Sequence, residues 1–248
     1  MQKLLTLSVI LLFTQSHATE LTDAIRTNDR HKIEQLLAQS STIIDTPDSY
    51  GDTPLIHAVS DNKKELAHLL LENGADINKP NNNGQTPLHT ALYYSNKELV
   101  QPLLQSGASP FIKDEEAKTA LDTLRVDNPY WSSEEKQPLI ELVEQYMRLF
   151  QEVQHSPTID TLKKAVQLGY PGLVKQLLKK IKPNIKQIRQ VGQLAQQEYN
   201  QTNNEAFTTT KRVLTDYMHA LMLAHAEPGI PADILPADIL HVIAGYAV

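Results

Sequence analysis

The chain has 248 residues, 41% of which are hydrophobic, and its formal net charge is −6. This hydrophobic content is enough for packed cores and excludes general disorder. The acidic balance argues against nucleic acid as a partner, because phosphate contacts need clustered cations. The chain holds no cysteine, which excludes disulfides, thiol catalysis and cysteine zinc sites.

The first residues have the layout of a secretory signal peptide. Lys3 gives a positive start, Leu4 to Phe13 form an apolar stretch, and Ser16-His17-Ala18 place small residues at a cleavage site. The apolar stretch is too short to cross a bilayer of about 30 Å as a helix. We therefore expect residues 1–18 to be removed and the protein, starting near Thr19, to be periplasmic or secreted. An uncleaved amphipathic N-terminus is the alternative.

A sequence repeat of thirty-three residues follows. Gly51-Asp52-Thr53-Pro54-Leu55 returns as Gly84-Gln85-Thr86-Pro87-Leu88, and Thr119-Ala120-Leu121 comes another thirty-three residues later. A second spacing joins one alanine to a pair of leucines twelve and thirteen residues on, and it begins at Ala24, Ala58, Ala91 and Ala165. A fixed period of this size indicates stacked modules that cover each other's apolar faces. Such arrays usually serve recognition, so we expect binding rather than chemistry.

The repeated residues predict two helices in each unit. A threonine caps the first helix, a proline takes the first helical position and a leucine follows. These residues are Thr53, Pro54 and Leu55 in one unit and Thr86, Pro87 and Leu88 in the next. The second helices are expected at Lys63–Glu72 and Asn96–Gln105. Gly74 and Gly107 fit the left-handed position that ends a helix.

Two of these segments resemble the ankyrin repeat, namely Thr86-Pro87-Leu88-His89-Thr90-Ala91 and Asn73-Gly74-Ala75-Asp76-Ile77-Asn78. The resemblance is specific for Gly51 to Ser109, and Glu20 to Ser40 looks like an N-terminal cap of the array. It implies antiparallel helix pairs joined by projecting β-turn fingers. It also implies a protein-binding scaffold without catalytic activity, in which His89 makes structural hydrogen bonds at the turn.

The ankyrin family usually binds through its finger tips and the exposed face of its first helices. Carried onto this chain, the resemblance implies that the partner-binding residues are Asp48, Tyr50, Asn81, Asn82, Asn83, Tyr93 and Tyr94. Tyr50 and one of the paired tyrosines are the preferred anchors, because aromatic residues concentrate binding energy at interfaces. Alternatively, the asparagines only form a soluble turn, and one tyrosine of the pair belongs to the core.

The third unit departs from the pattern. Ala117 replaces the turn glycine, Ala120 the proline and Asp122 the histidine. This unit is therefore degenerate, and its second helix is expected late, at Ser133 to Phe150, where apolar residues recur at helical spacing.

The second half is predicted to be helical. Thr161 to Lys180 is a repeat-like pair in which Pro171-Gly172 supplies the turn. Two more helices are expected at Ile185 to Tyr199 and Glu205 to Ala224, with a polar break at Gln201 to Asn204. The predicted fold class is therefore all-α, with an ankyrin-type helix-turn-helix solenoid at 19–125 and an irregular helical C-terminal region at 132–248.

Charge is unevenly divided in this half. Lys163 to Arg189 hold eight basic residues and no acidic residue, whereas Asp114 to Glu152 hold ten acidic and four basic residues. The basic segment could face an anionic partner, such as a membrane headgroup or nucleic acid. The favoured interpretation is that the two segments offset each other or form solvated helix faces.

The C-terminus carries a short motif. Leu235-Pro236-Ala237-Asp238-Ile239-Leu240 resembles the opening of an F-box, whose family recruits a ubiquitin-ligase adaptor. Under that hypothesis, Leu235, Pro236, Ile239 and Leu240 are the candidate adaptor-binding residues. A terminal helix that covers the core is the favoured alternative, because apolar stripes at helical spacing are usually buried.

These patterns favour an exported ankyrin-repeat scaffold that acts as a monomer and binds another protein. The alternative is a secreted bacterial effector whose C-terminus recruits host ubiquitin-ligase machinery, and a third hypothesis places an unrecognised enzymatic activity in the C-terminal half. We expect no catalytic residue, cofactor, metal or nucleic-acid partner, because His-Glu-x-x-His, Gly-x-Ser-x-Gly and phosphate-loop patterns are missing. Stable membrane insertion is not expected either, since no later stretch is long and apolar enough.

Overall fold

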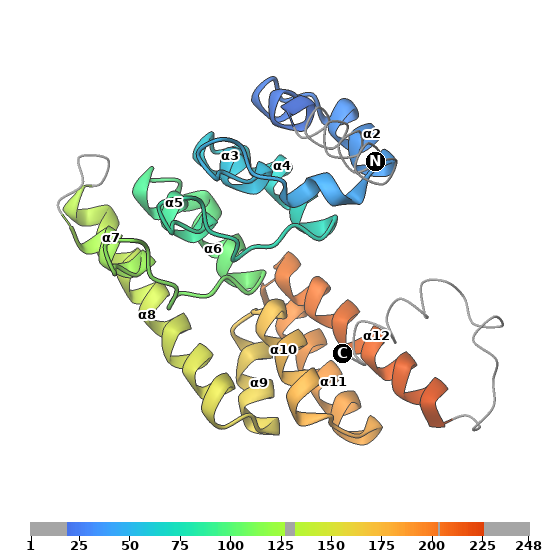
Figure 1. Ribbon diagram of the computed structural model, residues 1–248. Helices are drawn as coiled ribbons and strands as arrows, with labels where there is room; N and C mark the ends of the chain where they lie inside the picture. Colours follow the sequence, from blue (N-terminus) through green and yellow to red (C-terminus); the bar gives the residue numbers. More distant parts are fainter. Residues whose placement is uncertain (1–18, 127–131, 203, 226–248) are drawn as a thin grey trace, which may run out of the picture. The chain divides into compact units, whose positions relative to one another are not determined.

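The computed structural model describes residues 19–126, 132–202 and 204–225, and these residues form helices joined by turns (Figure 1). After a first helix at 19–26, the elements are α2 (Arg30–Gln39), the 3₁₀ helix η1 (Ser41–Asp45), α3 (Pro54–Ser60), α4 (Lys64–Glu72), α5 (Pro87–Tyr93), α6 (Lys97–Gln105), α7 (Ala120–Arg125), α8 (Ser133–His155), α9 (Ile159–Gln167), α10 (Pro171–Ile181), α11 (Ile185–Thr202) and α12 (Glu205–His225). The all-α prediction is confirmed for the described residues. None of their helices combines the length and the apolar character that a membrane span requires.

The chain divides into two compact units. The first consists of Met1–Leu104 and Ala108–Gln145, and the second of Gln105–Gly107 and Tyr146–Val248. The boundary falls inside α8. Residues 1–18 and 226–248 lie outside the described part, and with them the predicted signal peptide and the F-box-like motif.

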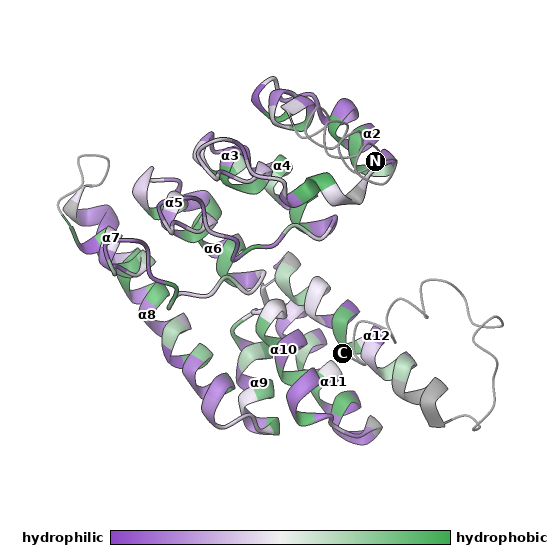
Figure 2. Ribbon diagram, in the orientation of Figure 1, coloured by the Kyte–Doolittle hydropathy of each residue, from purple (hydrophilic) through white to green (hydrophobic). Residues whose placement is uncertain are grey.

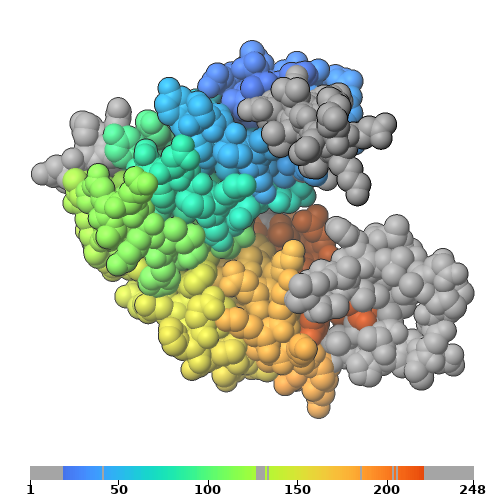
Figure 3. Space-filling view, viewed as in Figure 1, coloured from blue at the N-terminus to red at the C-terminus, as the bar shows by residue number. Residues whose placement is uncertain are grey.

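The first unit is a stack of helix pairs. Leu55, Leu88 and Leu121 occupy the same position in three successive first helices, and each is at most 3% exposed. Full burial of one such side chain contributes about 1.5–3 kcal/mol. Helix α3 packs against α5, and α5 packs against α7, so neighbouring pairs cover each other's apolar faces. Figure 3 shows these repeats in contact in chain order, from blue to light green.

Side chains also tie neighbouring pairs together in this unit. The amide nitrogen of Asn96 donates to the Val59 carbonyl at 2.6 Å, at the end of the preceding first helix. One repeat earlier, the Lys63 ammonium donates to the carbonyls of Ile25 and Arg26, both at 2.9 Å. The carbonyls at a helix C-terminus have no partner within the helix, so these bonds satisfy them across the repeat boundary.

The second unit contains the end of α8 and the helices α9 to α12. Helix α11 packs against α9 and α12, and α10 packs against the same two helices. The hydrophobicity colouring in Figure 2 shows green residues on each of these helices, in keeping with a shared apolar core. In that core, the rings of Tyr146 and Tyr170 meet edge to face with centroids 4.9 Å apart.

Some predicted boundaries are wrong in this half. Pro171 and Gly172 are not a turn but the first residues of α10, because proline suits the first helical position. The turn lies just before them, where Gly169 adopts a φ of +70°. Helix α8 continues past Phe150 to His155, because no proline or glycine occurs between Phe150 and Pro157. Helix α11 likewise runs past Tyr199 to Thr202, into the predicted polar break.

Candidate protein-binding surface

Three turns of the same construction form the fingers, at residues 48–52, 81–85 and 114–118. In each, the first residue carries a side-chain oxygen that accepts two backbone N–H groups, two and four residues further on. The acceptor and donors are Asp48 with Tyr50 and Asp52 (2.8 and 3.0 Å), Asn81 with Asn83 and Gln85 (3.0 and 2.9 Å), and Asp114 with Glu116 and Lys118 (both 2.9 Å). Asp and Asn suit this position because their short side chains can bond their own backbone.

Adjacent fingers are joined through their backbones. The N–H of Asn82 donates to the Tyr50 carbonyl at 3.1 Å, and the N–H of Glu115 donates to the Asn83 carbonyl at 3.0 Å. The amide nitrogen of Asn82 adds a bond to the Ser49 carbonyl at 3.1 Å. The three fingers therefore form one connected row.

Each finger leads directly into a first helix that a threonine caps. The hydroxyl oxygen of Thr53 accepts the N–H of Ile56 at 3.2 Å at the start of α3. At the start of α5, Nδ1 of His89 accepts the N–H of Thr86 at 3.3 Å and lies 2.8 Å from the Thr86 hydroxyl. Pro54 and Pro87 both occupy the first helical turn. These caps fix the angle at which each finger meets its helix.

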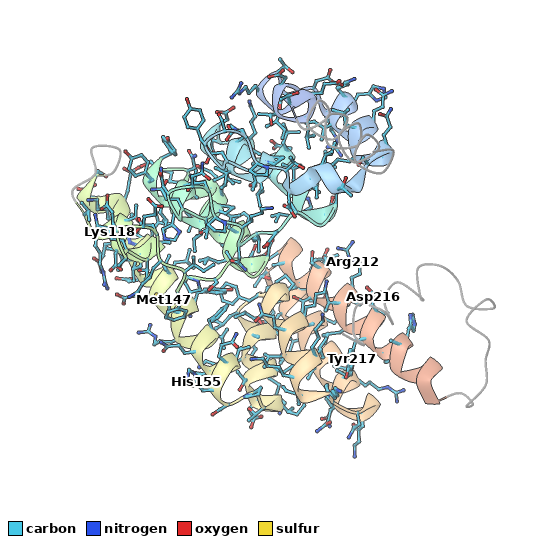
Figure 4. All side chains as sticks on the ribbon, in the orientation of Figure 1. Lys118, Met147, His155, Arg212, Asp216 and Tyr217 are labelled. Atoms are coloured by element: carbon cyan, nitrogen blue, oxygen red, sulfur yellow. The ribbon has the colours of Figure 1, made fainter. Side chains whose placement is uncertain are left out.

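His89 also connects its own repeat to the next finger. Its Nε2 lies 3.3 Å from the carbonyl oxygen of Lys118, which is at the base of the third finger. Figure 4 labels Lys118. A carbonyl only accepts, so Nε2 carries the hydrogen and Nδ1 is the acceptor. Burial lowers the pKa of His89 below 6.5, and the Lys118 carbonyl together with the charges of Asp114 and Asp122 partly opposes this shift. His89 therefore acts as a neutral structural bridge.

The tips of the fingers are exposed. Tyr50 is 74% exposed, and the side chains of Asn82 and Asn83 also face solvent. Asp48 and Asn81, by contrast, are half-buried, because their oxygens hold the turns and the Asn81 amide donates to Asp52 at 2.8 Å. Asp48 and Asn81 thus hold the turns, and the Asn82 amide joins two fingers through its bond to Ser49, whereas Tyr50 and Asn83 remain for contact.

The tyrosine pair lies at the opposite end of α5 from the finger. Tyr93 is the last residue of α5 and Tyr94 follows it, about 10 Å along the helix from Pro87. They are 42% and 46% exposed, so neither belongs to the core. Their rings meet nearly at right angles, with centroids 5.0 Å apart. Such an edge-to-face pair presents a firm aromatic surface.

The first finger also gathers three metal-ligating groups that the sequence analysis did not connect. Ligand atoms of Asp48, Asp52 and His57 lie within 4.8 Å of one another. Existing bonds account for the arrangement: Nε2 of His57 lies 3.1 Å from an oxygen of Asp48, whose other oxygen holds the turn. The cluster explains why the histidine of this repeat sits one place later than His89 does: it bonds to the finger instead of to the cap.

A second set of missed residues carries a clear signal in the sequence. Asp45 accepts the N–H of Asp76 at 3.0 Å, and Asn78 accepts the N–H of Ser109 at 2.7 Å. The two acceptors are thirty-three residues apart in the sequence, and so are the two donors. Extending the repeat comparison to single Asp and Asn residues would have found them.

Part of the chain matches a known family. Residues 21–114 match the family of ankyrin repeats, in three copies. No curated protein matches the chain. Among solved structures, the chain is similar to one described as the ankyrin repeat domain of Bcl-3, a unique member of the IkappaB protein family, with 30% identity and a TM-score of 0.43. The match covers 50% of this chain and 50% of that one.

The resemblance to ankyrin repeats is therefore confirmed for residues 21–114. Ankyrin repeats mediate binding to other proteins and are generally not catalytic. The family match ends before α7, so the degenerate third unit and the C-terminal helices lie beyond it.

Proposed function

We propose that the three ankyrin repeats at residues 21–114 make this chain a scaffold that binds another protein through its finger row and the exposed ends of its first helices. The observation that carries the proposal is that different finger residues hold the turns and face the solvent. The residues that hold the turns are turned inward, whereas Tyr50 at a tip is 74% exposed. Exposed aromatic residues on a firm backbone are suited to act as anchors at an interface.

The proposed scaffold acts as a monomer, without catalysis, cofactor or metal. Its rigidity supports this role, because the hydrogen bonds between fingers fix the surface before a partner arrives. A prearranged surface loses less conformational entropy on binding. The side chains at the tips can then contact the partner without a change in the fold.

The test is affinity capture from the native compartment, followed by a Kd measurement with each purified candidate partner. Tyr50→Ala and Tyr93→Ala should each weaken binding by roughly tenfold or more, as expected for anchor residues. Tyr199→Ala in α11 is the matched control and should leave the Kd unchanged. An unchanged Kd in both repeat variants, with unaltered thermal stability, contradicts the proposed surface.

Export is the second part of the proposal, and the layout of residues 1–18 supports it. Expression of the chain with and without residues 2–18, followed by cell fractionation, tests it. The longer chain should be found outside the cytoplasm and begin near Thr19 by N-terminal sequencing. A longer chain that stays uncleaved in the cytoplasm refutes export without affecting the binding proposal.

A narrower version gives the chain an effector role, in which the F-box-like segment recruits a ubiquitin-ligase adaptor. The only support is the similarity of Leu235 to Leu240 to the F-box opening. It predicts that a ubiquitin-ligase adaptor co-purifies with the chain and is lost when residues 231–248 are deleted. An adaptor that remains bound after the deletion removes this version.

A further inference from the structure

Five of the eight cations between residues 163 and 189 form neither an ion pair nor a side-chain hydrogen bond with a described residue. They are Lys175, Lys179, Lys182, Lys186 and Arg189, here called the basic row. All five are exposed, and none forms an ion pair with a described residue. The sequence from 161 to 197 contains no acidic residue at all.

The other three cations of the basic segment behave differently. Lys163 pairs with Asp160 at 3.1 Å, and Lys164 pairs with Glu152 at 2.6 Å. Lys180 donates to the Val153 carbonyl at 3.2 Å and to Gln154 at 2.6 Å. The expected offset by neighbouring acidic residues thus accounts for part of the segment and leaves the basic row uncompensated.

The basic row follows one continuous stretch of the chain. It runs over the last two turns of α10, the connection at Lys182, and the first turns of α11. Within α10 and within α11, neighbouring members of the row are three or four residues apart, which is about 4.5–6 Å along a helix. This separation is shorter than the screening length of about 8 Å at physiological salt, so neighbouring charges act together on an anion.

One member of the row occupies a position that does not favour it. Lys182 ends α10 with a φ of +50°, in the left-handed region where glycine or asparagine is preferred. Glycine would form this helix end with less strain, whereas lysine adds a positive charge next to the others.

We propose that the basic row binds the phosphate-bearing headgroups of an anionic membrane surface. Four of its five members are lysines, which act as point charges, whereas planar, bidentate phosphate recognition favours arginine. The stretch that carries the row has no aromatic residue between 171 and 198, whereas segments that bind single-stranded nucleic acid usually combine cations with aromatic residues on which bases stack. This surface association requires no spanning helix and is independent of protein binding by the ankyrin repeats.

Vesicle sedimentation tests the proposal with the chain from residue 19, so that the apolar leader contributes nothing. Phosphatidylcholine vesicles are compared with vesicles that also contain about 30% phosphatidylglycerol, at about 0.1 M and 0.5 M salt. The variant is Lys175→Gln/Lys179→Gln/Lys186→Gln. The matched control, Lys64→Gln/Lys79→Gln/Lys113→Gln, removes the same charge from the first unit. Thermal melts establish that both variants fold.

Wild type and control should bind the anionic vesicles and dissociate at the higher salt, whereas the basic-row variant should bind at least about tenfold more weakly. Equal binding by both triple variants overturns the proposal, and so does binding that ignores the phosphatidylglycerol. Inorganic phosphate and a DNA duplex are run as competitors. A duplex that binds more tightly than the vesicles, with the same dependence on the basic row, assigns the row to nucleic acid and overturns the membrane proposal.

Discussion

His89 and Asp122, thirty-three residues apart, do the same work in successive helices. Each side chain accepts the backbone N–H of the threonine three residues before it, at 3.3 Å for Thr86 and 3.0 Å for Thr119. The Asp122 carboxylate also accepts the Thr119 hydroxyl at 2.7 Å. An imidazole and a carboxylate thus serve one geometric role, and they differ in how protons affect them.

The carboxylate of Asp122 makes the third unit sensitive to acid. Hydrogen bonds from Thr119 hold the pKa of Asp122 below its ordinary 3.8, so its contribution to stability is present above that pH and is lost as the pH falls further. Asp122→Ala should lower the free energy of unfolding by about 1 kcal/mol at pH 7. Urea unfolding at pH 7 and pH 3 measures this. Asp122→Asn keeps the acceptor and should retain most of the stability at both pH values.

His89 should make the repeats less stable in mildly acidic solution. Burial lowers its pKa in the folded protein below 6.5, so the unfolded chain binds the proton more tightly than the folded one. Stability is therefore fully present above pH 6.5 and decreases as the pH falls below it. The urea midpoint of the wild type should drop between pH 7 and pH 5 by more than that of His89→Asn. If the urea midpoints of the wild type and His89→Asn fell equally between pH 7 and pH 5, His89 would not be the cause of the lost stability.

The third finger contains a strained alanine that glycine should relieve. Ala117 has a φ of +60°, at the position where Gly51 and Gly84 stand in the other fingers. A left-handed alanine costs about 1 kcal/mol. Glycine removes this strain, but its larger conformational entropy in the unfolded chain offsets part of the gain. Ala117→Gly should thus raise the free energy of unfolding by about 0.5 kcal/mol.

The reverse change provides the control for Ala117. In Gly84→Ala, the new Cβ would lie 2.8 Å from the Cα of Asp114 and 2.9 Å from the nitrogen of Glu115, both backbone atoms. We expect a loss of more than about 1 kcal/mol, since strain and overlap add. If Ala117→Gly and Gly84→Ala changed the free energy of unfolding in the same direction, the two finger positions would not be equivalent.

The Tyr146 hydroxyl should be dispensable for stability. Tyr146 is fully buried in the second unit, and its hydroxyl has no hydrogen-bond partner among the described residues. A buried hydroxyl without a partner costs about 1–3 kcal/mol. Tyr146→Phe should therefore leave the free energy of unfolding unchanged or raise it by about 1 kcal/mol, whereas Tyr170→Phe should bring no such gain. A clear loss in Tyr146→Phe would reveal a bond to the hydroxyl in solution.

The start of each repeat could be predicted from the sequence because local chemistry decides it. Thr53 with Pro54, and Thr86 with Pro87, combine a cap with a proline that tolerates the first helical turn, and no distant contact alters that choice. The left-handed ends at Gly74 and Gly107, with φ of +92° and +99°, are local in the same sense.

Longer-range features could not be predicted in this way. Whether Pro171 belongs to a turn or to a helix depends on where the chain turns before it. The left-handed Gly169 completes the turn and Tyr170 caps the helix, so Pro171 is the first residue of α10. The bridge from His89 to the Lys118 carbonyl spans twenty-nine residues, and only the stacking of repeats brings the two together. Likewise, a charge count could not separate the lysines that pair with acidic residues from those that do not.

The fingers are held by the first residue of each turn, at Asp48, Asn81 and Asp114, and by backbone groups. Side chains at the tips, such as Tyr50 and Asn83, contribute little to this framework. Mutations there can change what the protein recognises while leaving its shape intact. Evolution, or an engineer, can therefore exchange the partner of this chain without first having to compensate for lost stability.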